Sequence, residues 1–188
     1  MRIIRAADHQ VMPWKNGGGQ TAEIAVFPAD AALADFGWRI SMATVASDGP
    51  FSVFEGIDRT LTVLEGAGLI LAIEGQPRHT LTTSSAPLFF AADAATNSSL
   101  IDGTVTDLNV MTRRRRYTHS VRRLDIERDT SLTISASTTL IFCASGNLEV
   151  ESQTLSRFDA IVLENAQNLD LRPHDRASLI VIEIDPAA

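Results

Sequence analysis

The chain has 188 residues, of which 45% are hydrophobic and 21% are charged, and its formal net charge is −7. This balance is typical of a globular chain long enough for one large β domain or two small ones. The negative charge argues against a general affinity for polyanions such as nucleic acid. No apolar run reaches the roughly 18 residues of a membrane-spanning helix.

Short segments rich in Val, Ile, Leu, Thr and Phe recur along the chain, separated by Gly, Pro, Asp, Asn or Ser. This pattern predicts an all-β protein with little helix, built as a sandwich or barrel. The predicted strands lie near residues 2–5, 21–27, 37–46, 59–65, 68–74, 78–83, 87–91, 104–112, 130–135, 138–144, 147–151, 159–164, 168–172 and 177–184. A single helical turn is expected at 30–36.

Residues 59–71 and 139–150 share one plan, in which a strand, a turn ending in glycine and a second strand follow one another. Each is followed by polar residues and a further apolar strand. The strands and turns of a cupin barrel follow one another along the sequence in this order, and two copies about 80 residues apart suggest a bicupin. We therefore expect two packed cupin-like barrels in a single compact unit, residues 1–188.

The approximate halves of this unit are residues 1–112 and residues 124–188. Residues 113–123 would connect them, because runs of arginine indicate a surface strand or linker. We interpret this basic segment as a solvated face or a subunit contact rather than a nucleic-acid site, since aromatic residues make up only 6% of the chain. Residues 124–188 contain few clustered polar groups and are expected to be a structural half.

The lone cysteine, Cys143, lies in an apolar run and excludes any intrachain disulfide. A buried, unreactive thiol in a reducing compartment is the expected state. The first residues show no apolar stretch of a signal peptide. These features favour a cytoplasmic location and no association with a membrane.

Two segments, residues 12–24 and 48–59, crowd glycines, aromatic residues and polar groups together. Gly17, Gly18 and Gly19 supply no side chain to a core, so they suggest positive φ angles or a close backbone approach. A loose turn is the alternative. Backbone amides in such a turn can form an anion-binding nest, with Trp14 either a lid over it or a plug at a barrel end.

The order of several motifs resembles the HutD/Ves family of cupin-like proteins over most of residues 1–120. The motifs are Trp14-Lys-Asn-Gly-Gly-Gly19 followed by Thr21 and Glu23, Phe36-Gly-Trp-Arg-Ile-Ser41, Asp48-Gly-Pro-Phe-Ser52, Leu64-Glu-Gly66 and Asp107-Leu-Asn-Val-Met-Thr-Arg113. The resemblance implies a small-molecule-binding bicupin, linked in some members to histidine utilisation, without an established catalytic activity.

Strand periodicity places polar side chains on one face of three predicted strands. Small barrels that hold a ligand direct such side chains inward, whereas the alternative is a half-exposed sheet whose polar face meets water. If the polar side chains point into the barrel, the predicted ligand-binding residues are Trp14, Asn16, Gly17, Gly18, Thr21, Glu23, Arg39, Ser41, Arg59, Asp107 and Asn109.

Arg39 and Arg59 are the residues expected to hold a carboxylate. A buried arginine needs an anion, and Glu23 or Asp107 could be the protein's own partner. For Arg59, a surface position at the start of a strand is the alternative.

The four histidines are widely separated and form no His-x-His pair, so no metal or other cofactor is expected. No nucleophile elbow or phosphate-binding glycine loop is present either, and we assign no catalytic residue. The resemblance to the HutD/Ves family then implies a non-catalytic protein that weakly binds and senses a small acidic metabolite such as N-formylglutamate and regulates histidine utilisation.

Two alternatives remain for the function. One is a metal-independent isomerase or hydrolase that uses Glu23 or Asp107 as acid or base. The other is a protein-interaction module that uses the basic segment 113–123. Edge-strand pairing would make the protein a homodimer.

Overall fold

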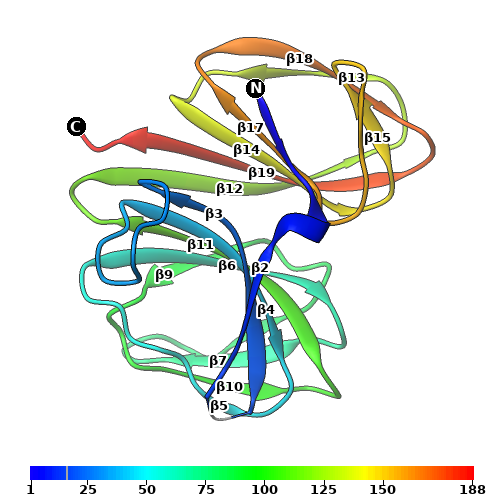
Figure 1. Ribbon diagram of the computed structural model, residues 1–188. Helices are drawn as coiled ribbons and strands as arrows, with labels where there is room; N and C mark the ends of the chain where they lie inside the picture. Colours follow the sequence, from blue (N-terminus) through cyan, green and yellow to red (C-terminus); the bar gives the residue numbers. More distant parts are fainter. Residues whose placement is uncertain (16) are drawn as a thin grey trace. The chain divides into compact units, whose positions relative to one another are not determined.

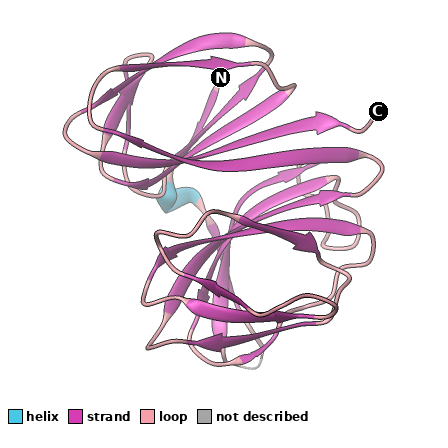
Figure 2. Cartoon of the chain, turned by 180° about the vertical axis from the view of Figure 1, so that it is seen from behind, coloured by secondary structure: helices cyan, strands magenta, loops and turns pink. Residues whose placement is uncertain are grey.

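The computed structural model describes residues 1–15 and 17–188 and consists almost entirely of strands (Figure 1). The one helix in the described residues is a short 3₁₀ helix, η1 (Ala6–Asp8) (Figure 2). None of the described helical residues forms a segment able to cross a membrane. The predicted all-β class is confirmed.

Contacts between residues divide the chain into two compact units. We call residues 10–116 the N-terminal barrel, and residues 1–9 together with 117–188 the C-terminal barrel. Each contains one larger and one four-stranded antiparallel sheet, and the larger sheet has six strands in the N-terminal barrel and five in the C-terminal barrel.

The six-stranded sheet of the N-terminal barrel carries the candidate site. Its order is β2 (Gln10–Pro13), β3 (Gly19–Phe27), β4 (Trp38–Val45), β11 (Val105–Arg113), β6 (Ile57–Glu65) and β9 (Leu88–Ala91). The four-stranded sheet has the order β5 (Gly49–Pro50), β10 (Thr96–Leu100), β7 (Leu69–Ile73) and β8 (His79–Leu81).

The C-terminal barrel begins with the first strand of the chain. Its larger sheet has the order β1 (Arg2–Ile4), β17 (Ala160–Glu164), β14 (Thr138–Ser145), β19 (Ala177–Pro186) and β12 (Tyr117–Ile126). Its four-stranded sheet has the order β13 (Thr130–Ile134), β18 (Gln167–Pro173), β15 (Leu148–Val150) and β16 (Gln153–Leu155).

The two barrels repeat one topology. The orders β4-β11-β6-β9 and β5-β10-β7-β8 recur as β12-β19-β14-β17 and β13-β18-β15-β16, so each strand corresponds to the one eight places later. The same glycine turn follows β6 and β14, at Gly66 and Gly146, both with positive φ. The predicted bicupin is confirmed, and the repeat gives each position of one barrel a counterpart in the other.

The observed units differ from the expected halves at two places. Residues 1–9 group with the C-terminal barrel, because β1 pairs with β17 through residues 2–4. The segment 113–123 was expected to be a surface strand or linker. Arg113 ends β11, residues 114–116 form a turn, and residues 117–123 are most of β12, which pairs with β19 along its full length. From Tyr117 to Arg122 partly buried residues alternate with exposed ones, as in an edge strand.

Several short strands were not predicted from the sequence, namely β2, β5, β10 and β16. In β10 (Thr96–Leu100) only Leu100 has a hydrophobic side chain, so the strand has no hydrophobic alternation by which the sequence could predict it. Residues 30–36 contain turns and no helix.

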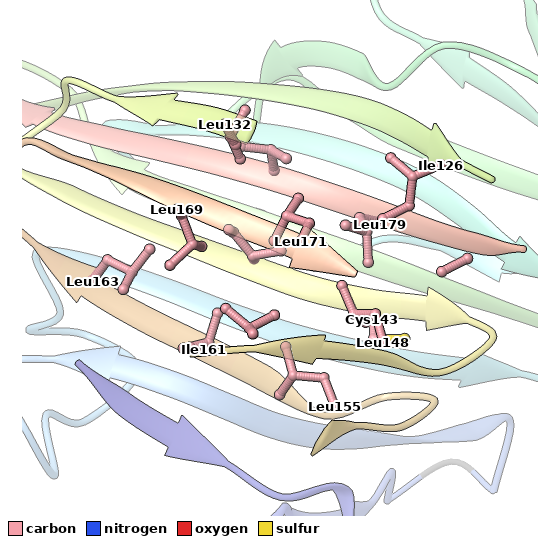
Figure 3. Packing of buried hydrophobic residues seen from close by; sticks show 14 of the residues in the cluster. Ile126, Leu132, Cys143, Leu148, Leu155, Ile161, Leu163, Leu169, Leu171 and Leu179 are labelled. Atoms are coloured by element: carbon pink, nitrogen blue, oxygen red, sulfur yellow. The ribbon is translucent and has the colours of Figure 1, made fainter. Parts of the chain in front are cut away.

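The two barrel interiors are filled differently. In the C-terminal barrel, fifteen buried residues, all apolar or cysteine, form one cluster that extends from Ile126 to Val181 (Figure 3). Cys143 belongs to it, and burial raises the pKa of its thiol to about 12, so the thiol stays protonated and unreactive. In the N-terminal barrel a smaller cluster, which includes Leu61 and Val63, shares the interior with polar side chains.

Gly66 offers a test of the turn that the two barrels share. A Cβ atom there would overlap the carbonyl oxygen of Thr104, and φ is +91°, so Gly66→Ala combines a clash with an unfavourable backbone conformation. Gly75 also has positive φ, +75°, but no atom lies within 4 Å of the position that a Cβ would take there. We expect Gly66→Ala to lower the free energy of unfolding by at least about 2 kcal/mol more than Gly75→Ala does.

Denaturant unfolding of both variants measures this difference. Equal losses would show that backbone conformation alone, and not the close approach to Thr104, makes glycine necessary at position 66.

Candidate functional site

The candidate site lies on the inner face of the six-stranded sheet, where β3, β4, β11 and β6 lie side by side. Leu61 and Val63 of β6 belong to the interior cluster and so identify the inner face. Cross-strand register then assigns three rows of side chains to this face: Val26–Arg39–Met111–Arg59, Glu23–Ser41–Asn109–Leu61 and Thr21–Ala43–Asp107–Val63. The polar residues predicted from strand periodicity therefore do share a face.

Arg39 is held by two neighbours on this face. Its side chain is 5% exposed, its Nε donates to Oε2 of Glu23 at 2.6 Å, and its Nη1 donates to Oγ of Ser41 at 3.2 Å. Glu23 is 20% exposed, so this ion pair lies at the edge of the buried region. A charge-assisted contact of this geometry fixes the guanidinium plane.

Arg59 is held by a second chain of contacts. Its Nε and Nη2 both donate to Oδ1 of Asn109, at 2.8 and 2.5 Å, and Nδ2 of Asn109 donates to Oδ1 of Asp107 at 2.6 Å. The guanidinium also stacks near two aromatic rings, 4.5 Å from the centroid of Phe51 and 5.8 Å from that of Phe90. Asn109 thus links the arginine to the carboxylate without a direct ion pair.

Burial shifts both ionisable ends of this chain. Burial raises the pKa of Asp107 to about 6, while the Arg59 charge and the Asn109 hydrogen bond act in the opposite direction. Burial also lowers the pKa of Arg59 to about 10; the Asp107 charge opposes this shift and the Arg39 charge adds to it. The two guanidinium groups are therefore close enough to repel each other.

Three polar atoms of the site keep unused hydrogen-bonding capacity. Oδ2 of Asp107 is buried and has no hydrogen-bond partner among the described residues. No described residue accepts a hydrogen bond from Nη2 of Arg39 or Nη1 of Arg59. An acceptor and donors that converge on one inner face can bind a small ligand that is anionic and also carries an N–H or O–H group.

The glycine segment packs beside β3, next to the site. Gly17 has φ +70°, and a Cβ on Gly19 would overlap the carbonyl oxygen of Thr44 and lie 3.0 Å from the Trp14 ring, so the predicted positive φ and close approach are both present. The Trp14 indole donates to Oγ1 of Thr21 at 2.8 Å. Trp14 is therefore joined to the row that contains Asp107.

The predicted anion nest would use the backbone amides of the glycine segment. The amide of Gly17 donates to the carbonyl oxygen of Trp14 at 3.1 Å, and the carbonyl oxygen of Gly18 accepts from the amide of Ala46 at 2.9 Å. The Gly17 amide is therefore already hydrogen-bonded within the turn. Asn16 lies outside the described residues.

Sequence reasoning missed two contributors to the site, Phe51 and Phe90. Phe51 lies in the Asp48–Ser52 motif, which could have marked it, whereas Phe90 faces Arg59 only through the pairing of β9 with β6. Asp58, the neighbour of Arg59, faces away and accepts from Nε of Arg114 at 2.7 Å. Within residues 1–15 and 17–188, no group of three His, Cys, Asp or Glu side chains could hold a metal ion.

Comparison with known proteins places the chain among close relatives. The HutD family model matches residues 6–181. An uncharacterised 21.2 kDa protein from the hutC 3′ region of Pseudomonas putida is 37% identical over 186 residues, which are 96% of each chain. Protein Ves of Citrobacter koseri is 38% identical over 144 residues, which are 76% of this chain and 72% of its own.

Solved structures show the same fold. A conserved protein of unknown function from Pseudomonas aeruginosa PAO1, PA5104, superposes with a TM-score of 0.89 at 34% identity over 98% of each chain. HutD from Pseudomonas fluorescens SBW25, solved in a formate condition, gives 0.85 at 29% identity, covering 100% of this chain and 99% of its own. Escherichia coli YhhW shares the fold alone, with 0.72 at 9% identity, covering 100% and 98%.

The raised pKa of Asp107 predicts an unusual pH dependence of stability. The pKa of this carboxyl is 3.8 in the unfolded chain and about 6 in the folded protein. Between pH 3.8 and pH 6 the folded state therefore binds more protons than the unfolded state does. The contribution of the carboxyl is complete below pH 3.8 and is lost as the pH rises through 6. Two pKa units correspond to about 3 kcal/mol of unfolding free energy.

Chemical denaturation of the wild type and of Asp107→Asn at several pH values isolates this contribution. We expect the stability of the wild type, relative to that of the variant, to fall by up to about 3 kcal/mol between pH 4 and pH 7. The other shifted aspartates, with lowered pKa values, cancel in the difference. A difference that stays constant over this range would contradict a raised pKa at Asp107.

Proposed function

Because the chain belongs to the HutD family, we propose that it is a non-catalytic bicupin that binds a small acidic metabolite in its N-terminal barrel. The observation that carries this proposal is the pair Arg39 and Arg59, both at most 9% exposed and both with N–H donors that no described residue uses. Two guanidinium groups that repel each other on one inner face gain most from an added anion.

The spacing of the arginines favours a ligand with two acidic groups. Arg39 and Arg59 face Met111 from its two sides, so their Cα atoms are two strand spacings, about 10 Å, apart. Side chains that reach inward from these positions can hold the two carboxylates of an N-formylglutamate-like molecule. Its amide N–H would then suit the unpaired Oδ2 of Asp107.

Membership of the HutD family and the relative in the hutC 3′ region support a regulatory role in histidine utilisation as part of this proposal. Such a ligand has about 12 heavy atoms, and about −0.3 to −0.6 kcal/mol per atom gives dissociation constants between millimolar and about 10 micromolar. Affinity in this range suits a gauge that follows the concentration of a metabolite in the cytoplasm.

Arg39→Met tests the proposal. We expect the variant to bind N-formylglutamate about 10- to 100-fold more weakly, because one charge-assisted contact is worth about 1.5–3 kcal/mol. Arg78→Met provides the matched control, since Arg78 is exposed on the same barrel and lies outside the site. Calorimetry with both purified variants, after circular dichroism has verified their folding, measures the effect.

Equal affinity in the two variants, or no heat with N-formylglutamate, glutamate or urocanate, would rule out the acidic-metabolite site. The same titrations with Arg59→Met show whether both guanidinium groups contact the ligand. Loss of binding in only one arginine variant would mean that a single carboxylate is recognised.

A second candidate is a metal-independent isomerase or hydrolase, and the titration of Asp107 favours it. A carboxyl with a pKa of about 6 can accept and release a proton near neutral pH, as a general acid or base must. Glu23 is the other candidate, although its carboxylate is bound to Arg39. Incubating the protein with the same acids separates the two functions, because a sensor returns its ligand unchanged and an enzyme accumulates product.

A further inference from the structure

The C-terminal barrel has a hollow of its own, away from its apolar cluster. Its volume is about 220 Å³, below the roughly 300–1,000 Å³ of pockets for drug-sized ligands, so it suits a small molecule or the end group of a larger one. It is lined by Thr118, His119, Ser120, Ser135, Ala136, Glu183 and Asp185. Three of the seven are hydroxyl residues and two are carboxylates.

The register of the sheet places this hollow at one end of the barrel's inner face. Ser120 of β12 and Thr139 of β14 both lie opposite Glu183 of β19, and Thr118 lies opposite Asp185. Directly opposed residues point to the same side of a sheet. The next row inward, Ile141 beside Val181, belongs to the apolar cluster.

The topological repeat relates this row to the candidate site of the N-terminal barrel. Strands β12, β19 and β14 correspond to β4, β11 and β6. When the shared turn glycines, Gly66 and Gly146, are aligned, the row Ser120–Glu183–Thr139 of one barrel corresponds to the row Arg39–Met111–Arg59 of the other. The basic end of the N-terminal barrel thus corresponds to an acidic end in the C-terminal barrel.

Neither carboxylate in the hollow is neutralised. Among the described residues, the Glu183 carboxylate accepts a hydrogen bond only from Oγ of Ser120, at 3.2 Å. Asp185 accepts from the amide and from Oγ of Ser137, both at 2.7 Å, and these contacts lower its pKa and keep it ionised. Among the ion pairs of the described residues, none involves either group.

A buried polar atom next to Glu183 also lacks a partner. Thr139 is fully buried and is not one of the seven lining residues, but it lies opposite Glu183, so its side chain points to the same inner face. Its Oγ1 has no hydrogen-bond partner in the described structure. A hydroxyl left unpaired in an otherwise satisfied core is costly, and a ligand's hydrogen-bond donor would remove that cost.

We propose that this hollow binds the primary ammonium group of a small organic amine. An ammonium carries three N–H donors and one positive charge. The carboxylates of Glu183 and Asp185 supply the counter-charge, and the hydroxyl oxygens of Ser120, Thr118 and Thr139 supply further acceptors. The site is separate from Arg39 and Arg59 and does not depend on their function.

A titration with 1,4-diaminobutane, followed by NMR of the ¹⁵N-labelled full chain, tests the proposal. We expect the amide signals of Ser120, Glu183 and Thr139 to shift, and 1,4-butanediol, the neutral analogue of similar length, to leave them unchanged. Glu183→Gln should weaken amine binding at least about tenfold, since it removes one of the two charges. Glu151→Gln, at an exposed turn residue, should have no effect.

Thr139→Val gives a second, independent variant. Replacing the unpaired hydroxyl with a methyl group should raise the melting temperature and weaken amine binding, whereas a purely structural threonine would change stability alone.

Three outcomes would overturn the proposal. In the first, butanediol shifts the same signals as the amine does, which would indicate a site for neutral hydroxyl compounds. In the second, calcium ions shift them and the amine does not, which would indicate an inorganic cation site. In the third, the amine causes no shift up to tens of millimolar at constant ionic strength.

Discussion

The constraint on which the N-terminal barrel depends is the placement of four charged groups on one inner face, where Arg39, Arg59 and Asp107 are buried and Glu23 is partly buried. An isolated charge in a protein interior is costly, so each needs a partner within the fold. Arg39 is satisfied by Glu23 and Ser41, and Arg59 by Asn109, which in turn holds Asp107. The two positive and two negative groups balance in charge. Their hydrogen-bonding capacity does not balance, because one carboxylate oxygen and two guanidinium nitrogens find no partner among residues 1–15 and 17–188. Sites where a protein leaves such groups unsatisfied are commonly those that it uses for binding.

The repeat shows that the polar interior of the N-terminal barrel results from its side chains and is not required by the fold. In the C-terminal barrel the positions that correspond to Asp107 and Asn109 are Leu179 and Val181, both fully buried in the apolar cluster. The same strand order and the same glycine turn therefore enclose a hydrogen-bonded network in one barrel and a filled core in the other. The two barrels therefore differ in which rows of the inner face are polar, as expected when different side chains are placed on a common scaffold.

Strand periodicity was sufficient to predict which side chains share the face of the site, because alternation has a period of two and each strand can be read alone. It predicted Arg39 with Ser41, and Asp107 with Asn109. It could not predict that Asn109 would bridge Arg59 to Asp107, since cross-strand partners depend on register between segments about 50 residues apart. The hollow of the C-terminal barrel was missed for the same reason: its hydroxyls and carboxylates come from opposite ends of residues 117–186, and no local cluster marks them.

The protonation state of Asp107 determines the charge balance of the candidate site and so the kind of ligand that the proposed site would prefer. With Asp107 ionised, an arriving carboxylate meets a nearby negative charge, but a ligand N–H finds an acceptor at Oδ2. With Asp107 protonated, the repulsion disappears and the carboxyl becomes a donor. A pKa of about 6 keeps the two states within reach of each other near neutral pH. A ligand that combines a carboxylate with an amide N–H can donate a hydrogen bond to ionised Asp107. A simple acid, which has no such donor, is favoured only when Asp107 is protonated. In the proposed site this single buried carboxyl can therefore discriminate between ligands that the two arginines alone would bind equally well.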